Sequence, residues 1–281
     1  MKCCILKKID LGEIILSVSA GPNFILVGGS SKTLKKILVE DSVGEPLNMC
    51  SHTKSIRHVT YHDNIIACGS YDCKATVFKD GICFDIIEGP DTEIKGLAIC
   101  KGYIAIATRG KTVWVYRIDE EIEIDTILED HTQDVKGVKW NMGCLYSYGY
   151  DGCINMYEDM ELIQSIKEHK STVWDIQFYG EQNMVSCSED GEIIFYSFEN
   201  IWKAKTRIRG SDFPIYTMAI YKNKYIGYVH NRSSILFIDE MQNDYLTIKD
   251  AGLGDIYSIS IWDNLLVVGG EDGILKILQI E

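Results

Sequence analysis

The sequence predicts an all-β fold, a seven-bladed β-propeller, from one pattern repeated about every 40 residues and from short strand-like runs joined by tight turns. The pattern is clearest in two successive copies that begin at His131 and His169, 38 residues apart. Each copy continues with alternating apolar residues, a run ending in small residues, an Asp-Gly turn and a third run. The absence of helical stretches between the runs favours blades over alternating helices and strands.

The rest of the chain follows the same unit. The first inward-facing apolar residues recur 38 to 42 residues apart, at Ile15, Ile56, Ile94, Val135, Val173, Ile215 and Ile256. Tight turns rich in Asp, Asn and Gly fall at 71–73, 109–111, 150–152, 189–191, 230–232 and 271–273. These residue types suit turns that need a left-handed backbone. Seven units of this length predict a single propeller domain over residues 1–281.

The two ends of the chain predict how the last blade is completed. The chain stops at Glu281, just after a third strand, and residues 3–9 have the composition of a fourth. We therefore expect the N-terminal strand to pair with the C-terminal blade, which would leave no long unpaired edge.

Composition excludes several classes of function. The net charge of −13 argues against binding to nucleic-acid phosphates. With no long apolar run and no secretory leader, we expect no membrane association and a location in the cytosol or nucleus. The ten cysteines include no Cys-x-x-Cys pair, so we expect reduced structural thiols, no metal site and no bound cofactor. No nucleophile–base pair or phosphate loop appears, which predicts no catalytic residue and no enzyme.

The repeat positions resemble those of the WD-repeat family. In that family a His, a Ser or Thr, a turn Asp and a Trp form a hydrogen-bonded chain within a blade. The resemblance implies this structural role for His131, Ser147, Asp151 and Tyr157, and for His169, Ser186, Asp190 and Tyr196. Tyr replaces Trp in both copies. The second blade keeps His52 and Asp72 with Phe78, whereas the third has Pro90 and Gly110 where His and Asp would stand.

A narrower resemblance rests on blades three to five. His-Thr-Gln-Asp-Val-Lys at 131–136, Ser-Thr-Val-Trp at 171–174 and Thr-Arg-Gly-Lys-Thr-Val-Trp-Val-Tyr at 108–116 are similar to the WD-repeat scaffold of cytosolic iron–sulfur protein assembly. The resemblance implies a non-catalytic scaffold that helps deliver [4Fe–4S] clusters to cytosolic and nuclear apoproteins without holding the cluster. It implies as partners a small cluster-targeting subunit, a HEAT-repeat adaptor, a hydrogenase-like cluster carrier and client apoproteins. The alternative is a generic WD-repeat adaptor, such as a ubiquitin-ligase substrate receptor or a signalling β-subunit.

Residues beside the tight turns and the first-strand anchors come to one narrow face of a propeller. The candidate partner-binding residues there are Arg109, Lys136, Trp174, Arg57, Tyr71, Tyr150, Glu189 and Lys95. Aromatic and arginine side chains gathered on one face are typical of interaction hot spots. The cations from consecutive blades predict a basic sector suited to an acidic partner segment. The alternative is that these are ordinary solvated side chains.

Overall fold

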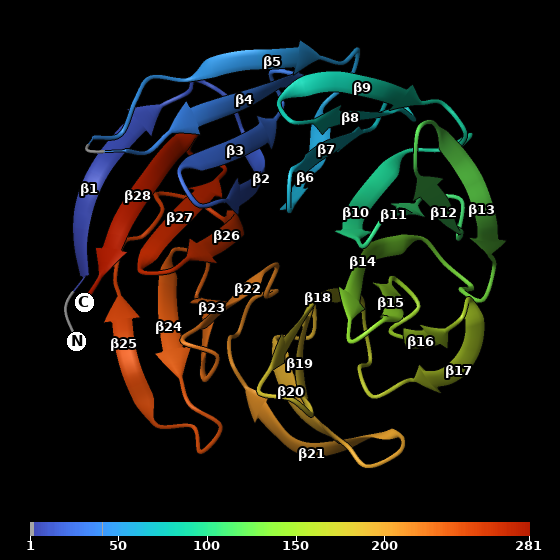
Figure 1. Cartoon of the computed structure of the whole chain (residues 1–281). Helices are drawn as coiled ribbons and strands as arrows, with labels where there is room; N and C mark the ends of the chain where they lie inside the picture. Colours follow the sequence, from blue (N-terminus) through green and yellow to red (C-terminus); the bar gives the residue numbers. More distant parts are fainter. Residues whose placement is uncertain (1–2, 41) are drawn as a thin grey trace. The chain divides into compact units, whose positions relative to one another are not determined.

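The computed structural model describes residues 3–40 and 42–281 (Figure 1). Met1, Lys2 and Asp41, which belong to the predicted 1–281 domain, lie outside the described residues. Across the described ranges the chain forms strands β1 to β28 in seven four-stranded antiparallel sheets and contains no helix. Those ranges accordingly hold no helix that could cross a membrane. The prediction of an all-β fold of seven repeats is confirmed.

The chain divides into two compact units. Unit 1 comprises the described residues of Met1–Val27, Lys35–Leu47 and Trp174–Glu281, and unit 2 comprises Gly28–Leu34 and Asn48–Val173. The division passes through the sheet of blade 1, whose strands are β2 (Ile15–Ala20), β3 (Phe24–Gly29), β4 (Thr33–Leu38) and β5 (Leu47–Ser51).

Unit 2 holds blades 2, 3 and 4. Blade 2 consists of β6 (Ile56–His62), β7 (Ile65–Ser70), β8 (Ala75–Lys79) and β9 (Ile82–Ile87). Blade 3 consists of β10 (Ile94–Cys100), β11 (Tyr103–Thr108), β12 (Val113–Ile118) and β13 (Ile122–Leu128). Blade 4 consists of β14 (Val135–Asn141), β15 (Cys144–Gly149), β16 (Ile154–Glu158) and β17 (Glu161–Ile166). Strand β10 packs against both β6 and β14, so the three blades follow one another in chain order.

Unit 1 holds blades 5, 6 and 7, apart from Val173 at the start of blade 5. Blade 5 consists of β18 (Val173–Tyr179), β19 (Asn183–Ser188), β20 (Glu192–Phe198) and β21 (Trp202–Arg209). Blade 6 consists of β22 (Met218–Tyr221), β23 (Tyr225–His230), β24 (Ser234–Ile238) and β25 (Asp244–Ile248). Blade 7 consists of β26 (Ile256–Trp262), β27 (Leu265–Gly270) and β28 (Ile274–Ile280), with β1 (Cys3–Asp10) as its fourth strand.

The N-terminal strand completes the last blade. In Figure 1, β1 in blue runs alongside β28 in red. The two strands are antiparallel, with Cys3 opposite Ile280 and Asp10 opposite Ile274. The side chain of Ile9 packs in the core of unit 1, and only 8% of this residue is exposed. The predicted pairing of the two ends is confirmed.

The second strand of each blade is apolar because sheets or side chains cover both of its faces. Every residue of β7 is buried, whereas the outer strand β9 leaves Ile82 73% exposed. Gly69, at the end of β7, faces β10 of the next blade. A Cβ there would lie 2.5 Å from Cγ2 of Ile94 and 3.1 Å from Cδ1 of Leu97. The small residues that end the second strands therefore allow blades to approach closely.

The turn before each third strand is closed by a left-handed residue. Within the described ranges its φ lies between 67° and 76° at Lys32, Cys73, Lys111, Gly152, Gly191, Arg232 and Gly273. Only three of these residues are glycine, although a side chain costs energy in this region. The turn geometry is therefore kept even in the blades whose sequences depart most from the repeat pattern.

The anchor residue of blade 6 is placed differently from the others. Six of the seven anchor residues begin a strand, whereas Ile215 lies three residues ahead of β22. Side chains of blade 5 hold the Met218 backbone: Asp175 Oδ2 accepts its N–H at 2.9 Å and Gln177 Nε2 donates to its carbonyl at 2.8 Å. Ile215 is nevertheless fully buried.

Candidate functional site

Blade 4 brings together the four residues expected to form a hydrogen-bonded chain. His131 Nδ1 lies 2.9 Å from Asp151 Oδ2, and its Nε2 lies 2.7 Å from Ser147 Oγ. Ser147 Oγ in turn donates to the Tyr157 hydroxyl at 3.5 Å. All four residues are buried, and burial raises the pKa of Tyr157 to about 12. The arrangement links strands of one sheet and points no reactive group to solvent.

In blade 5 the corresponding residues fall in both units. Within unit 1, Ser186 Oγ lies 3.1 Å from the Tyr196 hydroxyl, and Asp190 Oδ1 accepts the N–H of Glu192 at 2.9 Å. His169 belongs to unit 2, where it is buried.

Blade 3 has replaced the missing Asp by a hydroxyl. Thr92 Oγ1 accepts the N–H of Gly110 at 2.8 Å, at the turn where blades 2, 4, 5 and 7 have an aspartate. Thr112 Oγ1 lies 2.8 Å from Thr108 Oγ1 and accepts the indole N–H of Trp114 at 2.9 Å. Threonines therefore carry the internal hydrogen bonds of this blade.

Blade 2 keeps the His–Asp pair but surrounds the histidine differently. His52 Nδ1 lies 3.0 Å from Asp72 Oδ2, as in blade 4. Its Nε2 faces Thr76 Oγ1 at 3.1 Å and Cys68 Sγ at 3.5 Å, and Cys50 Sγ lies 3.8 Å from Cys68 Sγ. The hydrogen bond from Cys68, with help from His52, outweighs burial and lowers the pKa of the Cys50 thiol to about 5.

This thiol–imidazole cluster was missed from the sequence, where the cysteines were expected to be reduced structural thiols. Two signals could have found it. Cys68 occupies the repeat position of Ser147 and Ser186, and Cys50 stands two residues before His52.

Unit 2 groups the predicted basic residues around shared neighbours. Lys95 Nζ lies 3.2 Å from Glu93 Oε2 and 4.8 Å from the centre of the Tyr71 ring. Arg109 Nη1 lies 3.6 Å from the same Glu93 oxygen, with 62% of the Arg109 side chain exposed. Among the predicted partner-binding residues of unit 2, Arg109 has a guanidinium group that a partner can reach.

Arg57 and Lys136 both lie close enough to His58 to affect its ionisation. Burial first, and then the charges of Lys136, Arg57 and Lys139, lower the pKa of His58 to about 3. Lys136 is only 6% exposed, so it contributes positive potential rather than contact area. Tyr150 is half-buried, and its backbone N–H donates to the Asp134 carbonyl at 3.0 Å.

In unit 1 the predicted contact residue Trp174 belongs to a row of three aromatic side chains. The ring of Trp174 meets Tyr216 edge to face at 5.0 Å between centroids, and Tyr216 meets Tyr257 at 5.5 Å. Glu189 is exposed beside the row: after burial and Asp255, its charge helps raise the pKa of Tyr216. Such rows supply rigid contact area for a protein partner.

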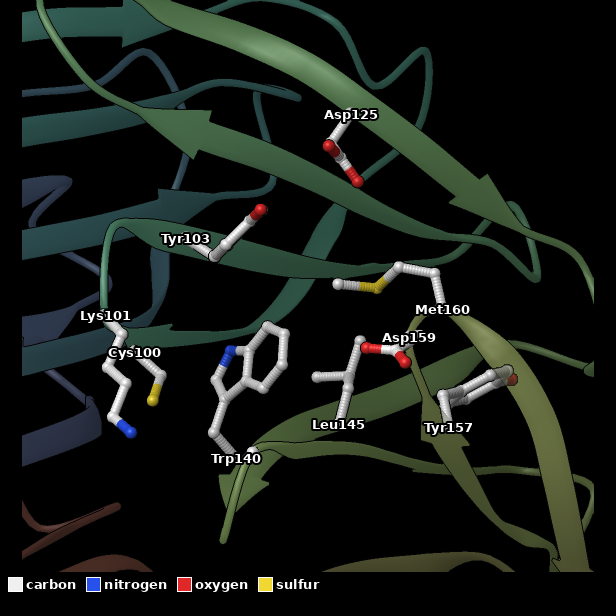
Figure 2. Close-up of a pocket in the computed structure, with 10 residues that line it drawn as sticks. Cys100, Lys101, Tyr103, Asp125, Trp140, Leu145, Tyr157, Asp159 and Met160 are labelled. Carbon is white, nitrogen blue, oxygen red and sulfur yellow. The ribbon is translucent and has the colours of Figure 1, made fainter.

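A pocket between blades 3 and 4 was not expected from the sequence. Figure 2 shows the side chains of Trp140, Leu145 and Met160 around one hollow. The lining residues are Cys100, Lys101, Tyr103, Asp125, Trp140, Gly143, Leu145, Tyr157, Asp159 and Met160. None of these ten is a histidine or serine, so the pocket offers no hydroxyl nucleophile with an imidazole base.

Comparison with known proteins assigns the fold. The model of the WD domain, G-beta repeat family matches residues 160–197. The crystal structure of the WD40 beta propeller domain of Doa1 superposes with a TM-score of 0.88 over 100% of this chain and 97% of that one, at 15% identity. The fold is a seven-bladed β-propeller. The predicted fold class is thereby confirmed.

The propeller is similar to curated proteins of iron–sulfur assembly. It is 28% identical over 130 residues to the probable cytosolic iron-sulfur protein assembly protein 1 of Chaetomium globosum, covering 34% of this chain and 29% of that protein. The protein of the same name from Botryotinia fuckeliana is 31% identical over 122 residues, covering 37% and 28%. The probable cytosolic Fe-S cluster assembly factor of Schizosaccharomyces japonicus is 25% identical over 315 residues, covering 95% and 51%.

These matches confirm the resemblance stated from the sequence. The propeller spans about half or less of the length of these curated relatives.

Proposed function

We propose that this propeller is a non-catalytic scaffold of cytosolic iron–sulfur cluster assembly, which helps deliver [4Fe–4S] clusters to apoproteins by protein–protein contacts. The observation that carries the proposal is the match to an Fe–S cluster assembly factor over 95% of this chain. Two further relatives with a cytosolic iron–sulfur assembly name support it and favour a cytoplasmic location.

The scaffold works through surfaces, without a cluster of its own. Its partners are other components of the assembly machinery, which we propose to be a small cluster-targeting subunit, a HEAT-repeat adaptor, a hydrogenase-like cluster carrier and client apoproteins. Two surfaces suit such partners: the basic group around Arg109 in unit 2 and the Trp174–Tyr216–Tyr257 row in unit 1.

Arg109 is the residue we expect to matter most for an acidic partner. Its side chain is 62% exposed, and its Nη1 makes only a long contact of 3.6 Å with Glu93 Oε2. A carboxylate of a partner could therefore replace this loose contact with a bidentate pair. Against a chain whose net charge is −13, a local basic group also orients the approach of acidic segments.

The test is affinity capture from native lysate with the wild-type chain, Arg109→Glu and the control Arg117→Glu. Arg117 is also exposed, but it lies on β12 and pairs with Asp119 and Glu123. We expect the wild type and the control to recover iron–sulfur assembly components, and Arg109→Glu to lose a carrier or client selectively.

Two results would contradict parts of this proposal. Capture of ubiquitin-ligase or signalling components in place of assembly proteins would favour the generic adaptor. Equal capture by Arg109→Glu and Arg117→Glu would exclude the basic group as the docking surface while leaving the scaffold role intact.

A further inference from the structure

We propose that Cys50 of blade 1, together with His52 and Cys68 at blade 2, forms a binding site for a thiophilic metal ion, with Zn²⁺ as the ion that the geometry fits. The three donor atoms come from β5, from the connection to β6, and from β7. Cys68 and the His52 side chain are almost fully buried. The site concerns residues that the proposed scaffold function does not use, and it stands or falls independently of that function.

The distances between the donor atoms are those of a tetrahedral zinc site. With Zn–S bonds of about 2.3 Å and Zn–N bonds of about 2.0–2.1 Å, two sulfurs lie about 3.8 Å apart, and a sulfur lies about 3.5 Å from a nitrogen. The structure places the sulfurs of Cys50 and Cys68 3.8 Å apart, and Cys68 Sγ 3.5 Å from His52 Nε2. All three donor atoms fall within 4.8 Å of one another. The three donor atoms are therefore close enough for one ion to contact them all.

The histidine is oriented for this role by a carboxylate. Asp72 Oδ1 and Oδ2 lie 3.1 Å and 3.0 Å from His52 Nδ1, which places the N–H on that side of the ring and leaves the Nε2 lone pair toward the sulfurs. The backbone N–H groups of Thr53 and Lys74 hold the carboxylate at 2.8 Å and 3.1 Å. A carboxylate that fixes the tautomer of a metal-binding histidine is the usual outer partner in zinc sites.

Comparison with blade 4 shows what is special in blade 2. In blade 4 the same histidine position bonds Ser147 Oγ at 2.7 Å, and the residue two positions before that histidine is the exposed Glu129. Around His52, Cys68 replaces the hydroxyl, and Cys50 brings a second sulfur near the imidazole. Thiolates select Zn²⁺ and Cu⁺ over Mg²⁺ and Ca²⁺, which prefer oxygen.

Access and coordination number also fit a metal ion. Cys50 is only half-buried, so the ion can enter from the outer strand β5. Three protein donors leave a fourth position for water or for Thr76 Oγ1, which already lies 3.1 Å from His52 Nε2. The chain thereby supplies a site with an open position rather than a closed structural site.

The test uses the full chain, reduced and stripped of metal, titrated with Zn²⁺ against a chromophoric chelator and with Co²⁺ followed by visible absorbance. We expect one Zn²⁺ per chain and a tetrahedral, thiolate-bound Co²⁺ spectrum. Cys50→Ser and Cys68→Ser should lose both, and Asp72→Asn should weaken binding by roughly 10- to 100-fold. The control Cys83→Ser alters an exposed cysteine of β9 and should bind as the wild type does.

Cys68→Ser is the most informative variant because it recreates the blade 4 arrangement of His131 and Ser147. It should therefore fold and melt like the metal-free wild type, so its loss of Zn²⁺ cannot be attributed to unfolding.

Three outcomes would overturn the proposal. A fully reduced wild-type chain that binds no Zn²⁺ excludes the site. Retention of Zn²⁺ by both Cys50→Ser and Cys68→Ser places the ion elsewhere. Cluster absorbance after loading with iron and sulfide, dependent on the same three residues, would make this a cluster site instead. A negative result here leaves the lysate capture experiment unaffected.

Discussion

At the scale of single residues, the His131–Asp151 pair shows how a buried charge is kept in a blade. Desolvation raises the pKa of the Asp151 carboxyl. The hydrogen bond and charge of His131, with the N–H groups of Thr132 and Cys153, outweigh that effect and lower the pKa to about 2. The N–H groups donate at 2.9 Å and 3.1 Å. A carboxylate satisfied in this way stabilises the turn only while it is ionised.

This predicts a stability that depends on pH. The folded pKa of Asp151 lies below its ordinary value of 3.8, so the carboxylate stabilises the protein above about pH 4 and loses this effect as pH falls toward 2. The lost stabilisation is on the order of 2 kcal/mol. Asp151→Asn should reduce the free energy of unfolding at neutral pH and flatten its decline between about pH 5 and pH 2. Urea unfolding at several pH values measures this; parallel curves for variant and wild type would contradict it.

At the scale of elements, β1 shows how a strand from one end of the chain stabilises the other. It pairs with β28 along its length, and Ile9 fills the core of unit 1 while Ile5 is 53% exposed. Its contribution to stability therefore comes from the ladder of backbone hydrogen bonds and from a few inward side chains.

We expect Ile9→Ala to lower the free energy of unfolding by roughly 2 kcal/mol or more, because it leaves a cavity in a packed core. Ile5→Ala is the matched control on the same strand and should change it by less than about 0.5 kcal/mol. Deleting residues 1–9 should lower the melting temperature further. Thermal unfolding measures all three. An unchanged melting temperature after the deletion would show that β1 contributes nothing to stability.

At the scale of the whole molecule, the contacts of the chain divide into two units, and the division passes through blade 1. The single domain predicted over residues 1–281 requires the two units to unfold together. Propellers bury most of their apolar surface between neighbouring blades, as at Gly69 against Ile94 in unit 2. Unfolding of one blade therefore exposes the next.

We expect one cooperative thermal transition, with equal calorimetric and van't Hoff enthalpies. Tryptophan fluorescence supplies a second probe, since Trp114 and Trp140 lie in unit 2 and Trp174, Trp202 and Trp262 in unit 1. Coincident curves from both methods support a single domain. Two separated transitions would show that the units unfold independently.

Sequence alone determined the features that depend on local chemistry and on repetition. The period of about 40 residues and the turns with left-handed residues follow from short motifs, because turn geometry and strand alternation act over a few residues. The pairing of β1 with β28 followed from repetition, because the last repeat lacks a fourth strand and residues 3–9 have the composition of one. The resemblance to the WD-repeat family also sufficed to group His131, Ser147, Asp151 and Tyr157, since residues at equivalent positions of a blade meet in the same way.

Only the tertiary structure decided which side chains from distant strands share one environment. Cys50 and Cys68 lie on β5 and β7, and their 3.8 Å approach depends on the register of strands and on the path of the chain between blades. Likewise, the sequence predicted Lys136 to be a partner-binding residue, but its side chain is buried. Thr92 makes the hydrogen bond at the turn of blade 3 that has no Asp. Strand alternation assigns a side chain to a face, whereas its neighbours on that face are set by packing between sheets.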